Sequence, residues 1–357
     1  MEKGLFVTVP ISACYNRLRM KIGLIGLGFM GSTHLKALQK IPGVEVVAVS
    51  SDDPRALSGD LSHIQGNIGG PGEKLDFSSL RQYSDAFAAA RDPEAEAVDV
   101  CLPTNLHAGV VIEALRAGKH VLVEKPMALT AAETGQMLEA AEKAGRLLMV
   151  AQVLRFWPAY VALAGLVKTG KLGPVRSALF RRRCAAPAWS AWLSDASLSG
   201  GGVFDLLIHD IDICLHLFGP PEAVSASGYE DLKRGIDFVL AQLHYPGIGT
   251  VAVTGGWHHL KSYPFSMEYT VSGDQGTVEF SSAGRPPALY RADGSVEELP
   301  QSEKDGYQAE IEYFIECCRG GRKPEVCPPE ESAAAVKLAR LVLEAREKEG
   351  ERIACKL

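Results

Sequence analysis

The chain has 357 residues, of which 46% are hydrophobic and 22% are charged, and these proportions are ordinary for globular proteins. Its length exceeds what one hydrophobic core usually supports, so we expect two domains. A formal net charge of -6 and a sequence pI of about 5.9 argue against binding to a nucleic-acid backbone, and the composition gives no sign of a membrane span. We therefore expect neither a nucleic-acid partner nor a membrane partner.

Eight cysteines are spread along the chain without a CxxC pair or a zinc-type spacing of cysteine and histidine. We expect reduced thiols, a cytoplasmic location and no bound metal. The segment from Ile11 to Cys14 resembles the end of a lipoprotein export signal, but Pro10 interrupts its apolar stretch. Residues 1–19 are therefore interpreted as an N-terminal extension that lies outside the fold.

Strand-like and helix-like runs alternate between Met20 and residue 150, which is typical of a parallel sheet with crossover helices. Thr130 with Glu133 three residues later forms the pattern of a helix capping box. A Gly-rich stretch within 58–80 indicates a surface insertion. We expect an α/β fold whose first domain, 20–150, is a doubly wound Rossmann sheet with strands at 21–25, 44–49, 98–102, 120–123 and 147–150 and helices at 29–40, 105–117 and 131–143.

A complete GxGxxG motif follows the first strand and begins the first helix of this domain. The first glycine permits a tight turn, the second lets the backbone approach a pyrophosphate, and the third lets helix and strand pack closely. The amino-terminal end of the helix adds free N–H groups and the positive end of the helix dipole. The spacing predicts a dinucleotide site formed by Gly26, Gly28, Phe29, Met30 and Gly31.

The end of the second strand indicates which nicotinamide cofactor binds. An acidic side chain that contacts the ribose hydroxyls is expected about twenty residues past the glycines, and Ser51 aligns best with that position. Asp52 and Asp53 follow it, and no Arg or Lys stands beside it to bind a 2′-phosphate. The residues therefore favour NAD over NADP.

Two further segments follow strands at the carboxyl edge of the sheet, where open α/β sheets bind ligands. Glu124 and Lys125 come directly after the apolar strand 120–123, and we expect both to contact the cofactor. Lys125 is either a solvated lysine or one held beside the nicotinamide. The other segment runs from Pro103 to His107. Within it, Asn105 is either a helix cap or a cofactor contact, and His107 is either a surface residue or a cofactor contact. The cofactor residues expected from this segment are Pro103, Thr104, Asn105 and His107.

After residue 151 the chain becomes rich in strands, and we expect a second domain over 151–357 with one helix over 203–218. Asp205, His209, Asp212 and His216 recur along one face of this helix, between apolar residues. A metal site is one interpretation, but a further ligand at motif spacing is missing. The pattern favours an acid/base pair of Asp205 and His209, with His216 in a structural role.

Three other features carry weaker expectations. Trp189 and Trp192 precede three glycines and are either core residues or rings that stack on a sugar. Arg181, Arg182 and Arg183 alternate along a strand, which we interpret as a solvated edge. The segment 330–349 reads as an amphipathic helix that packs back on the body of the protein.

Several runs together resemble the Gfo/Idh/MocA family, whose members include glucose-fructose oxidoreductase and inositol dehydrogenase types. These runs are GLIGLGFMGSTHL, then CLPTNLHAGVVIEALRAGKHVLVEKPMALT, then QVLRFWPAY and GGGVFDLLIHDIDICLHLFG. The resemblance covers essentially all of 20–357. The EKP segment and the DxxxHDxD helix are specific in combination.

The resemblance implies a second domain with an open, mostly antiparallel sheet that binds the substrate and often forms homodimers or homotetramers. It also implies that Lys125, Asp205 and His209 are the catalytic groups, and that Arg155 and Tyr307 line the substrate cleft. Trp192 is a further substrate candidate, because its ring could stack on a sugar. The implied reaction is oxidation of a sugar, a polyol or a related secondary alcohol. Ser51 departs from the acidic residue of the NAD-type pattern.

We therefore expect hydride transfer between NAD and a secondary alcohol, in either direction. Two alternatives stay open at this point. One is a NAD-dependent glycosidase on the same fold, which oxidises, eliminates and re-reduces its substrate. The other is a sugar-sensing regulator without turnover, against which the combination of Lys125, Asp205 and His209 argues.

Overall fold

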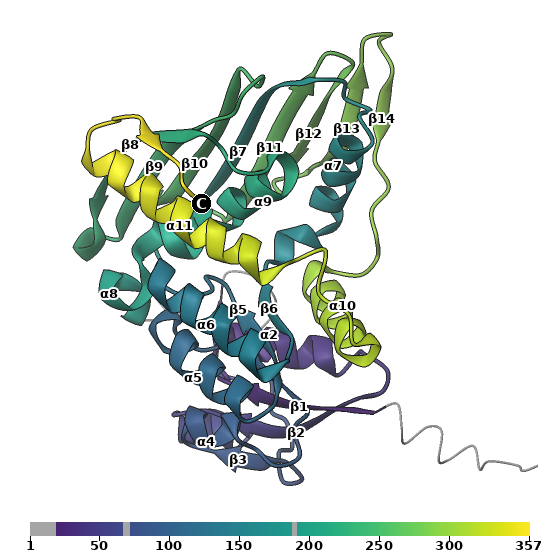
Figure 1. The fold of residues 1–357 in the computed structure, drawn as a ribbon, viewed down its shortest axis with the longest axis vertical. Helices are drawn as coiled ribbons and strands as arrows, with labels where there is room; N and C mark the ends of the chain where they lie inside the picture. Colours follow the sequence, from purple (N-terminus) through teal and green to yellow (C-terminus); the bar gives the residue numbers. More distant parts are fainter. Residues whose placement is uncertain (1–18, 67–71, 188–190) are drawn as a thin grey trace, which may run out of the picture.

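A computed structural model describes residues 19–66, 72–187 and 191–357, which form two β-sheets with helices packed on them (Figure 1). The expected extension at 1–19 lies outside the described residues except for Arg19, and so does the middle of the expected insertion at 58–80. The first sheet has six parallel strands in the order β3-β2-β1-β4-β5-β6. Its strands are β1 (Met20–Ile25), β2 (Val44–Ser50), β3 (Arg81–Tyr83), β4 (Ala97–Val100), β5 (His120–Glu124) and β6 (Leu148–Ala151).

The expected Rossmann sheet is confirmed, and every strand and helix expected within 20–150 is present to within two residues at each end. The capping box is also present, because the backbone N–H of Glu133 donates to Oγ1 of Thr130 at 3.2 Å and Oε2 of Glu133 accepts from the backbone of Thr130 at 2.9 Å. The helices of this half are α2 (Phe29–Leu38), α3 (Pro54–Leu57), α4 (Ala86–Ala90), α5 (Thr104–Arg116) and α6 (Ala131–Ala144).

The second sheet has nine strands in the order β14-β13-β12-β11-β7-β10-β9-β8-β15. Only its β7 and β10 pair in parallel, so the sheet is mostly antiparallel as expected. Its strands are β7 (Val175–Ala185), β8 (Ala223–Asp231), β9 (Ile236–His244), β10 (Thr250–His259), β11 (Ser266–Gly273), β12 (Gly276–Ser281), β13 (Arg285–Arg291), β14 (Val296–Glu298) and β15 (Ile353–Ala354).

The interpretation of 181–183 as an edge was wrong, because β7 lies between β10 and β11 in the middle of this sheet. Arg182 points into the core, where its guanidinium donates to both carboxylate oxygens of Asp210 at 2.7 and 3.2 Å. Arg181 and Arg183 point to the opposite face and both pair with Glu268. Alternation along the strand thus gives three neighbouring arginines two different environments.

Helices cover one face of the second sheet and connect it to the first (Figure 1). The helix α11 (Pro329–Glu347) packs on β8, α9 and α6, which confirms the expected C-terminal helix. The helix α10 (Gly306–Gly320) returns to the first sheet and packs on α2. Division of the chain at residue 150 stays a prediction, and the second half supplies part of the packing of the first.

The other elements are η1 (Val153–Arg155), α7 (Pro158–Lys168), η2 (Ala191–Ser194), α8 (Ala196–Ser199), η3 (Val203–Leu207), α9 (Ile208–Phe218) and η4 (Leu232–Arg234).

Arg155 joins three separate segments within the core. Its Nε and Nη2 donate to the two carboxylate oxygens of Asp212 at 2.8 and 2.7 Å, and its Nη1 contacts Glu331 and the carbonyl oxygen of Val326 at 3.1 Å. The Arg155 side chain is completely buried. These contacts give Arg155 a structural role, and they do not support the substrate contact that the family resemblance implied.

Two further observations bear on sequence expectations. The cysteines at 101, 184, 214, 317, 318, 327 and 355 are free thiols, as expected for the described part of the chain. Within that same part, none of the helices is both long and apolar enough to cross a membrane.

Candidate active site

The loop between β1 and α2 has the shape that a pyrophosphate site requires. Gly26 has φ +99°, and a Cβ there would lie 2.3 Å from the carbonyl oxygen of Cys101. A Cβ on Gly31 would lie 1.9 Å from the carbonyl oxygen of Gly26, so helix and strand pack too closely for any side chain. A Cβ on Gly28 would meet no described atom within 4 Å. The first and third glycines thus shape the turn, and the second borders open space.

This open space lies at the amino-terminal end of α2. Gly28 caps the helix without a side-chain hydrogen bond, and the first turn carries no acidic residue. The first N–H groups of any α-helix lack partners within the helix, and they favour an anion there. The loop therefore fits a dinucleotide phosphate, with Phe29 and Met30 in the first turn beside it.

At the end of β2, Ser51 is buried and its Oγ accepts from the backbone N–H of Asp53 at 3.2 Å. Asp53 caps α3 by accepting from the backbone of Arg55 at 2.8 Å, and it also contacts His63 at 2.7 Å. The guanidinium of Arg55 donates to Asp60 and to Ser62, each at 3.0 Å. Arg55, the next basic residue along the chain after Ser51, is thus already paired.

The segment from Pro103 to His107 forms the start of α5, with Pro103 at the cap position and Thr104 buried in the first turn. Asn105 is therefore not the cap, and its Oδ1 is buried without a hydrogen-bond partner among the described residues. His107 is not on the surface but buried, with Nδ1 2.9 Å from the carbonyl oxygen of Pro126 and Nε2 2.8 Å from that of Leu102. His107 thus connects the two loops at this edge of the sheet, and Asn105 retains an unused acceptor.

Lys125 and Asp205 meet although they are 80 residues apart in the chain. The ammonium of Lys125 donates to the backbone carbonyl oxygen of Asp205 at 2.8 Å and to its Oδ1 at 3.2 Å. The two side chains are 13% and 26% exposed, so the pair lies at the border of solvent. Lys125 directly follows β5 of the first sheet, and Asp205 lies in η3, beside the second sheet.

A wide helical turn sets the position of Asp205. The segment η3 is a π-helix, and regular α-helix begins only at Ile208. The backbone N–H of Val203 donates to Asp237 at 3.1 Å, and a Cβ on Gly202 would lie 2.9 Å from the ring of Trp257. Asp237 also pairs with Arg346 of α11. Asp205 thus follows a turn that is fixed by a buried carboxylate and by contact of a glycine with an indole ring.

His209 is one turn beyond Asp205, and the structure gives it no contact with that carboxylate. Its Nδ1 is buried and has no hydrogen-bond partner among the described residues. Burial lowers the pKa of His209 well below the ordinary value, and the nearby positive charges of Lys125 and Arg182 lower it further. His209 is therefore a neutral imidazole with a free proton-accepting capacity. Asp205 contacts Lys125 instead of this imidazole.

The remaining members of the expected polar stripe belong to the core. Asp212 pairs with Arg155, and Nδ1 of His216 lies 3.4 Å from the same guanidinium. The structural role expected for His216 is consistent with this contact. The polar stripe therefore divides in two. Asp205 and His209 lie near Lys125, whereas Asp212 and His216 contact Arg155.

The aromatic candidates lie on two sides of this region. Trp192 packs in a small apolar cluster with Leu206 and Trp257, whereas Trp189 lies outside the described residues. Tyr307 lies in the first turn of α10, with its ring 6.1 Å from that of Trp157 in an edge-on contact. Burial raises the pKa of the Tyr307 hydroxyl, and the negative charge of Glu124 raises it further.

Sequence reasoning missed several buried polar residues in this region. His34 and Asp99 are in contact beneath the phosphate-binding loop, and Glu310 lies beside them. Gln152, directly after β6, is buried with both polar atoms of its amide unpartnered among the described residues. The available signal was the polar residue within an apolar strand, as in the run AVDVCL that contains Asp99.

Comparisons with known proteins agree with this geometry. Residues 20–152 match the model of an oxidoreductase family with an NAD-binding Rossmann fold, and residues 160–279 match the GFO/IDH/MocA C-terminal domain. The chain belongs to the Gfo/Idh/MocA oxidoreductase family. It is accordingly an NAD-dependent oxidoreductase, as the sequence motifs indicated.

Relatives within the Gfo/Idh/MocA family cover most of the chain. It is 26% identical to scyllo-inositol 2-dehydrogenase (NAD(+)) of Bacillus subtilis, over 86% of this chain and 89% of that protein. It is 27% identical to myo-inositol 2-dehydrogenase of Thermotoga maritima, over 86% and 90% of the two chains. The fold matches aldose-aldose oxidoreductase from Caulobacter crescentus complexed with glycerol, with a TM-score of 0.79, 24% identity, and coverage of 94% of this chain and 100% of that one.

We predict that the protein binds NAD several-fold more tightly than NADP, because Asp52 and Asp53 repel a 2′-phosphate and Arg55 is already paired. Fluorescence titration with both cofactors measures the preference. Ser51→Arg is expected to narrow or invert it, whereas Ser51→Ala, which removes the hydroxyl without adding charge, leaves NADP binding weak. Tighter binding of NADP by the unmodified protein would contradict this assignment.

Proposed function

We propose that this protein transfers a hydride between NAD and a secondary alcohol of a sugar, a polyol or a related compound, with Lys125, Asp205 and His209 as its catalytic groups. The observation that carries the proposal is the contact between the Lys125 ammonium and Asp205 at the carboxyl edge of the NAD-binding sheet, beside a neutral His209. Inositol dehydrogenases among its relatives support this substrate class. Bound NAD supplies the hydride acceptor.

The residues suit the proton transfer that must accompany loss of hydride from the carbinol carbon. The hydroxyl proton has to pass to a base within hydrogen-bond reach. His209 is neutral and its Nδ1 lacks a partner among the described residues, so it is the acceptor that this geometry favours. The ammonium of Lys125 donates hydrogen bonds and can stabilise the developing alkoxide. Asp205 holds that ammonium in place.

Other groups suit recognition of the two ligands. We assign cofactor contacts to the glycine-rich loop, to Ser51 and to the segment 103–107, where the unpartnered Oδ1 of Asn105 can accept from an amide. Trp192 and Tyr307 are assigned to the substrate, because they lie beside Leu206 and Glu124 respectively. Arg155 is left out, since its guanidinium is already paired.

A panel of polyols, sugars and aryl glycosides, each incubated with the full chain and NAD, tests the proposed reaction. We expect net formation of NADH with at least one polyol or sugar. Release of aglycone without net NADH would instead identify a glycosidase, and tight sugar binding without either product would identify a sensor. Either of these two results contradicts the proposal.

Replacement of the catalytic groups is expected to lower turnover to different extents. Lys125→Ala and His209→Ala should each lower kcat by about 100-fold or more, because acid/base catalysis contributes roughly 10²- to 10⁴-fold. Asp205→Asn should cost less, since the backbone carbonyl oxygen that accepts from Lys125 remains. NAD affinity should stay nearly unchanged in all three variants.

Steady-state kinetics with NAD titration measures these effects, and Lys143→Ala provides a matched control because Lys143 lies on the surface of α6, paired with Glu139. A Lys125→Ala enzyme that turns over at near the unmodified rate would remove Lys125 from the mechanism. His209 would then act without help from Lys125.

We also propose that the protein is a homodimer or homotetramer that uses the uncovered face of the second sheet. Leu179 of β7 and Leu240 of β9 are 43% and 45% exposed there, while alternate residues of both strands are buried under the helices. Sedimentation should therefore give a mass well above the 38.3 kDa of one chain. Leu240→Glu should lower that mass, whereas Val161→Glu on exposed α7 should not. A single-chain mass for the unmodified protein would contradict this proposal.

The cytoplasmic location expected from the cysteine pattern stays a prediction. Fractionation of cells that produce the protein would check it, and recovery outside the cytoplasm would contradict it.

A further inference from the structure

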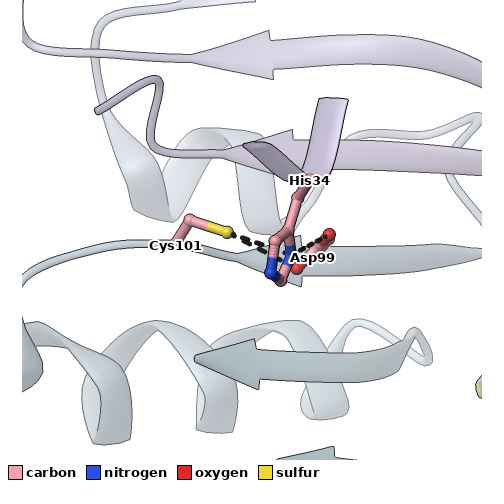
Figure 2. A group of neighbouring side chains, drawn as sticks. All are labelled: His34, Asp99 and Cys101. Carbon is pink, nitrogen blue, oxygen red and sulfur yellow. Dashed lines mark hydrogen bonds and ion pairs between the residues drawn. The ribbon is translucent and has the colours of Figure 1, made fainter. Parts of the chain in front are cut away.

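A row of buried ionisable side chains lies beneath the turn that carries Lys125. His34 lies on α2, three residues after Gly31, and its side chain is completely buried. Its Nδ1 lies 2.9 Å from Oδ2 of Asp99 on β4 (Figure 2), and its Nε2 lies 3.1 Å from Oε1 of Glu124 on β5. The imidazole therefore bridges carboxylates from two neighbouring strands.

The second oxygen of Glu124 connects this bridge to the catalytic lysine. Oε2 of Glu124 accepts from the backbone N–H of Lys125 at 2.9 Å. The contacts thus run without interruption from the phosphate-binding helix, through His34 and the Glu124 carboxylate, to the backbone of Lys125. The carbonyl oxygen of Pro126 contacts His107, so the turn is held on both sides of the lysine.

Charge makes this bridge strong. Burial opposes a charged imidazole at His34, but the carboxylate of Asp99 outweighs it and raises the pKa well above the ordinary value. Burial also acts to raise the pKa of Glu124, but His34 and Lys125 hold it below the ordinary value. The raised pKa favours a charged imidazole between the two carboxyl groups, and charge-assisted contacts are shorter and stronger than neutral ones.

The helix α10 covers the cluster with two further ionisable groups. Oε1 of Glu310 lies 4.0 Å from Nε2 of His34, and the ring of Tyr307 lies 6.3 Å from the imidazole ring. Burial raises the pKa of Glu310 well above the ordinary value. The charge of His34 acts to lower that pKa, and the charge of Glu124 acts to raise it. Glu310 is therefore protonated, and it brings no additional charge to the bridge.

We propose that His34 is a positioning residue for Lys125, acting through Glu124 to fix the turn from which the lysine side chain reaches Asp205. The inference rests on the proposed function and deepens it, because it assigns a purpose to buried side chains that are not among the three catalytic groups. Stability alone does not account for the arrangement, since a buried ion pair is often no more stabilising than apolar residues of the same volume.

A bound metal is the competing interpretation of the same side chains. Ligand atoms of His34 with Asp99 and Cys101, and of His34 with Glu124 and Glu310, lie within 4.8 Å of one another. Nδ1 of His34, however, is hydrogen-bonded to Asp99, and its Nε2 lies in an ion pair with Glu124. A cation at either nitrogen would displace the proton that makes that contact. Metal analysis of the purified full chain is expected to find no stoichiometric ion. One ion per chain that is lost in His34→Gln would overturn the proposal.

The first test follows the position of Lys125 without any turnover. Acetic anhydride labels accessible amines, and mass spectrometry of the digested protein gives the rate for each lysine. We expect His34→Gln to raise labelling of Lys125 several-fold relative to Lys143 on the surface, because the turn loses its anchor. Leu35→Met, a volume-conserving change in the next residue of α2, should leave that rate unchanged. Equal labelling of Lys125 in His34→Gln and the unmodified protein would overturn the proposal.

The second test asks whether His34 acts through the lysine. His34→Gln should lower kcat by about 10- to 100-fold, the range expected when a catalytic group is displaced by about 1 Å. In a Lys125→Ala background the same change should alter kcat by less than about twofold, because the group that His34 positions is already gone. Equal losses in both backgrounds would show a general structural effect and overturn the inference.

A second variant guards against a folding defect in His34→Gln. Glu124→Gln keeps an acceptor for the Lys125 backbone but removes the charge that pairs with His34, and the same changes in labelling and kcat are expected. The two tests separate this inference from the proposed function. Faster labelling of Lys125 without any dehydrogenase activity would support positioning and refute the reaction, whereas dehydrogenase activity with unchanged labelling would do the opposite.

Discussion

The contact between Lys125 and Asp205 is the interaction on which the rest of the site depends. It joins the carboxyl edge of the parallel sheet to the π-turn beside the second sheet, across 80 residues of sequence. Other contacts also hold the backbone at Lys125 and the turn that carries Asp205. On one side Glu124 accepts from the Lys125 backbone, and on the other Asp237 accepts from the backbone that begins the π-turn. Because each partner is fixed by a buried carboxylate, the ammonium can meet Asp205 without ordering a flexible loop.

Buried charge pairs recur throughout this molecule, and they have a common arrangement. Arg155 pairs with Asp212, Arg182 pairs with Asp210, and His34 lies between Asp99 and Glu124. The first two pairs attach neighbouring positions of α9 to different segments, which fixes how this helix is rotated about its axis. Such pairs contribute little net stability but penalise any packing that separates them. The rotation of α9 in turn determines where His209 points.

Features that depend on local sequence patterns could be predicted from the sequence, whereas features that depend on contacts between distant residues could not. The glycine-rich loop and the Thr130 capping box are motifs of at most six residues, so their spacing could be recognised in the sequence, although Gly26 also packs against the distant carbonyl oxygen of Cys101. Helical spacing placed Asp205 and His209 on one face, but the π-turn directs Asp205 to Lys125 instead of to the imidazole. The ion pair of Arg155 could not be predicted from local spacing, because its partner Asp212 is 57 residues away. The central place of β7 depends on strand order, which alternation along one strand cannot reveal.

The same charges that fix the lysine also determine the protonation of its neighbour. Lys125 and Arg182 both lower the pKa of His209, and burial acts in the same direction, so this imidazole stays neutral. Beneath the turn that carries Lys125, His34 has a raised pKa instead, because carboxylates surround it. Two histidines near one lysine thus differ in charge according to the sign of their closest neighbours. A neutral imidazole can accept a substrate proton, and a charged one can bridge two carboxylates, so environment assigns the two rings different tasks.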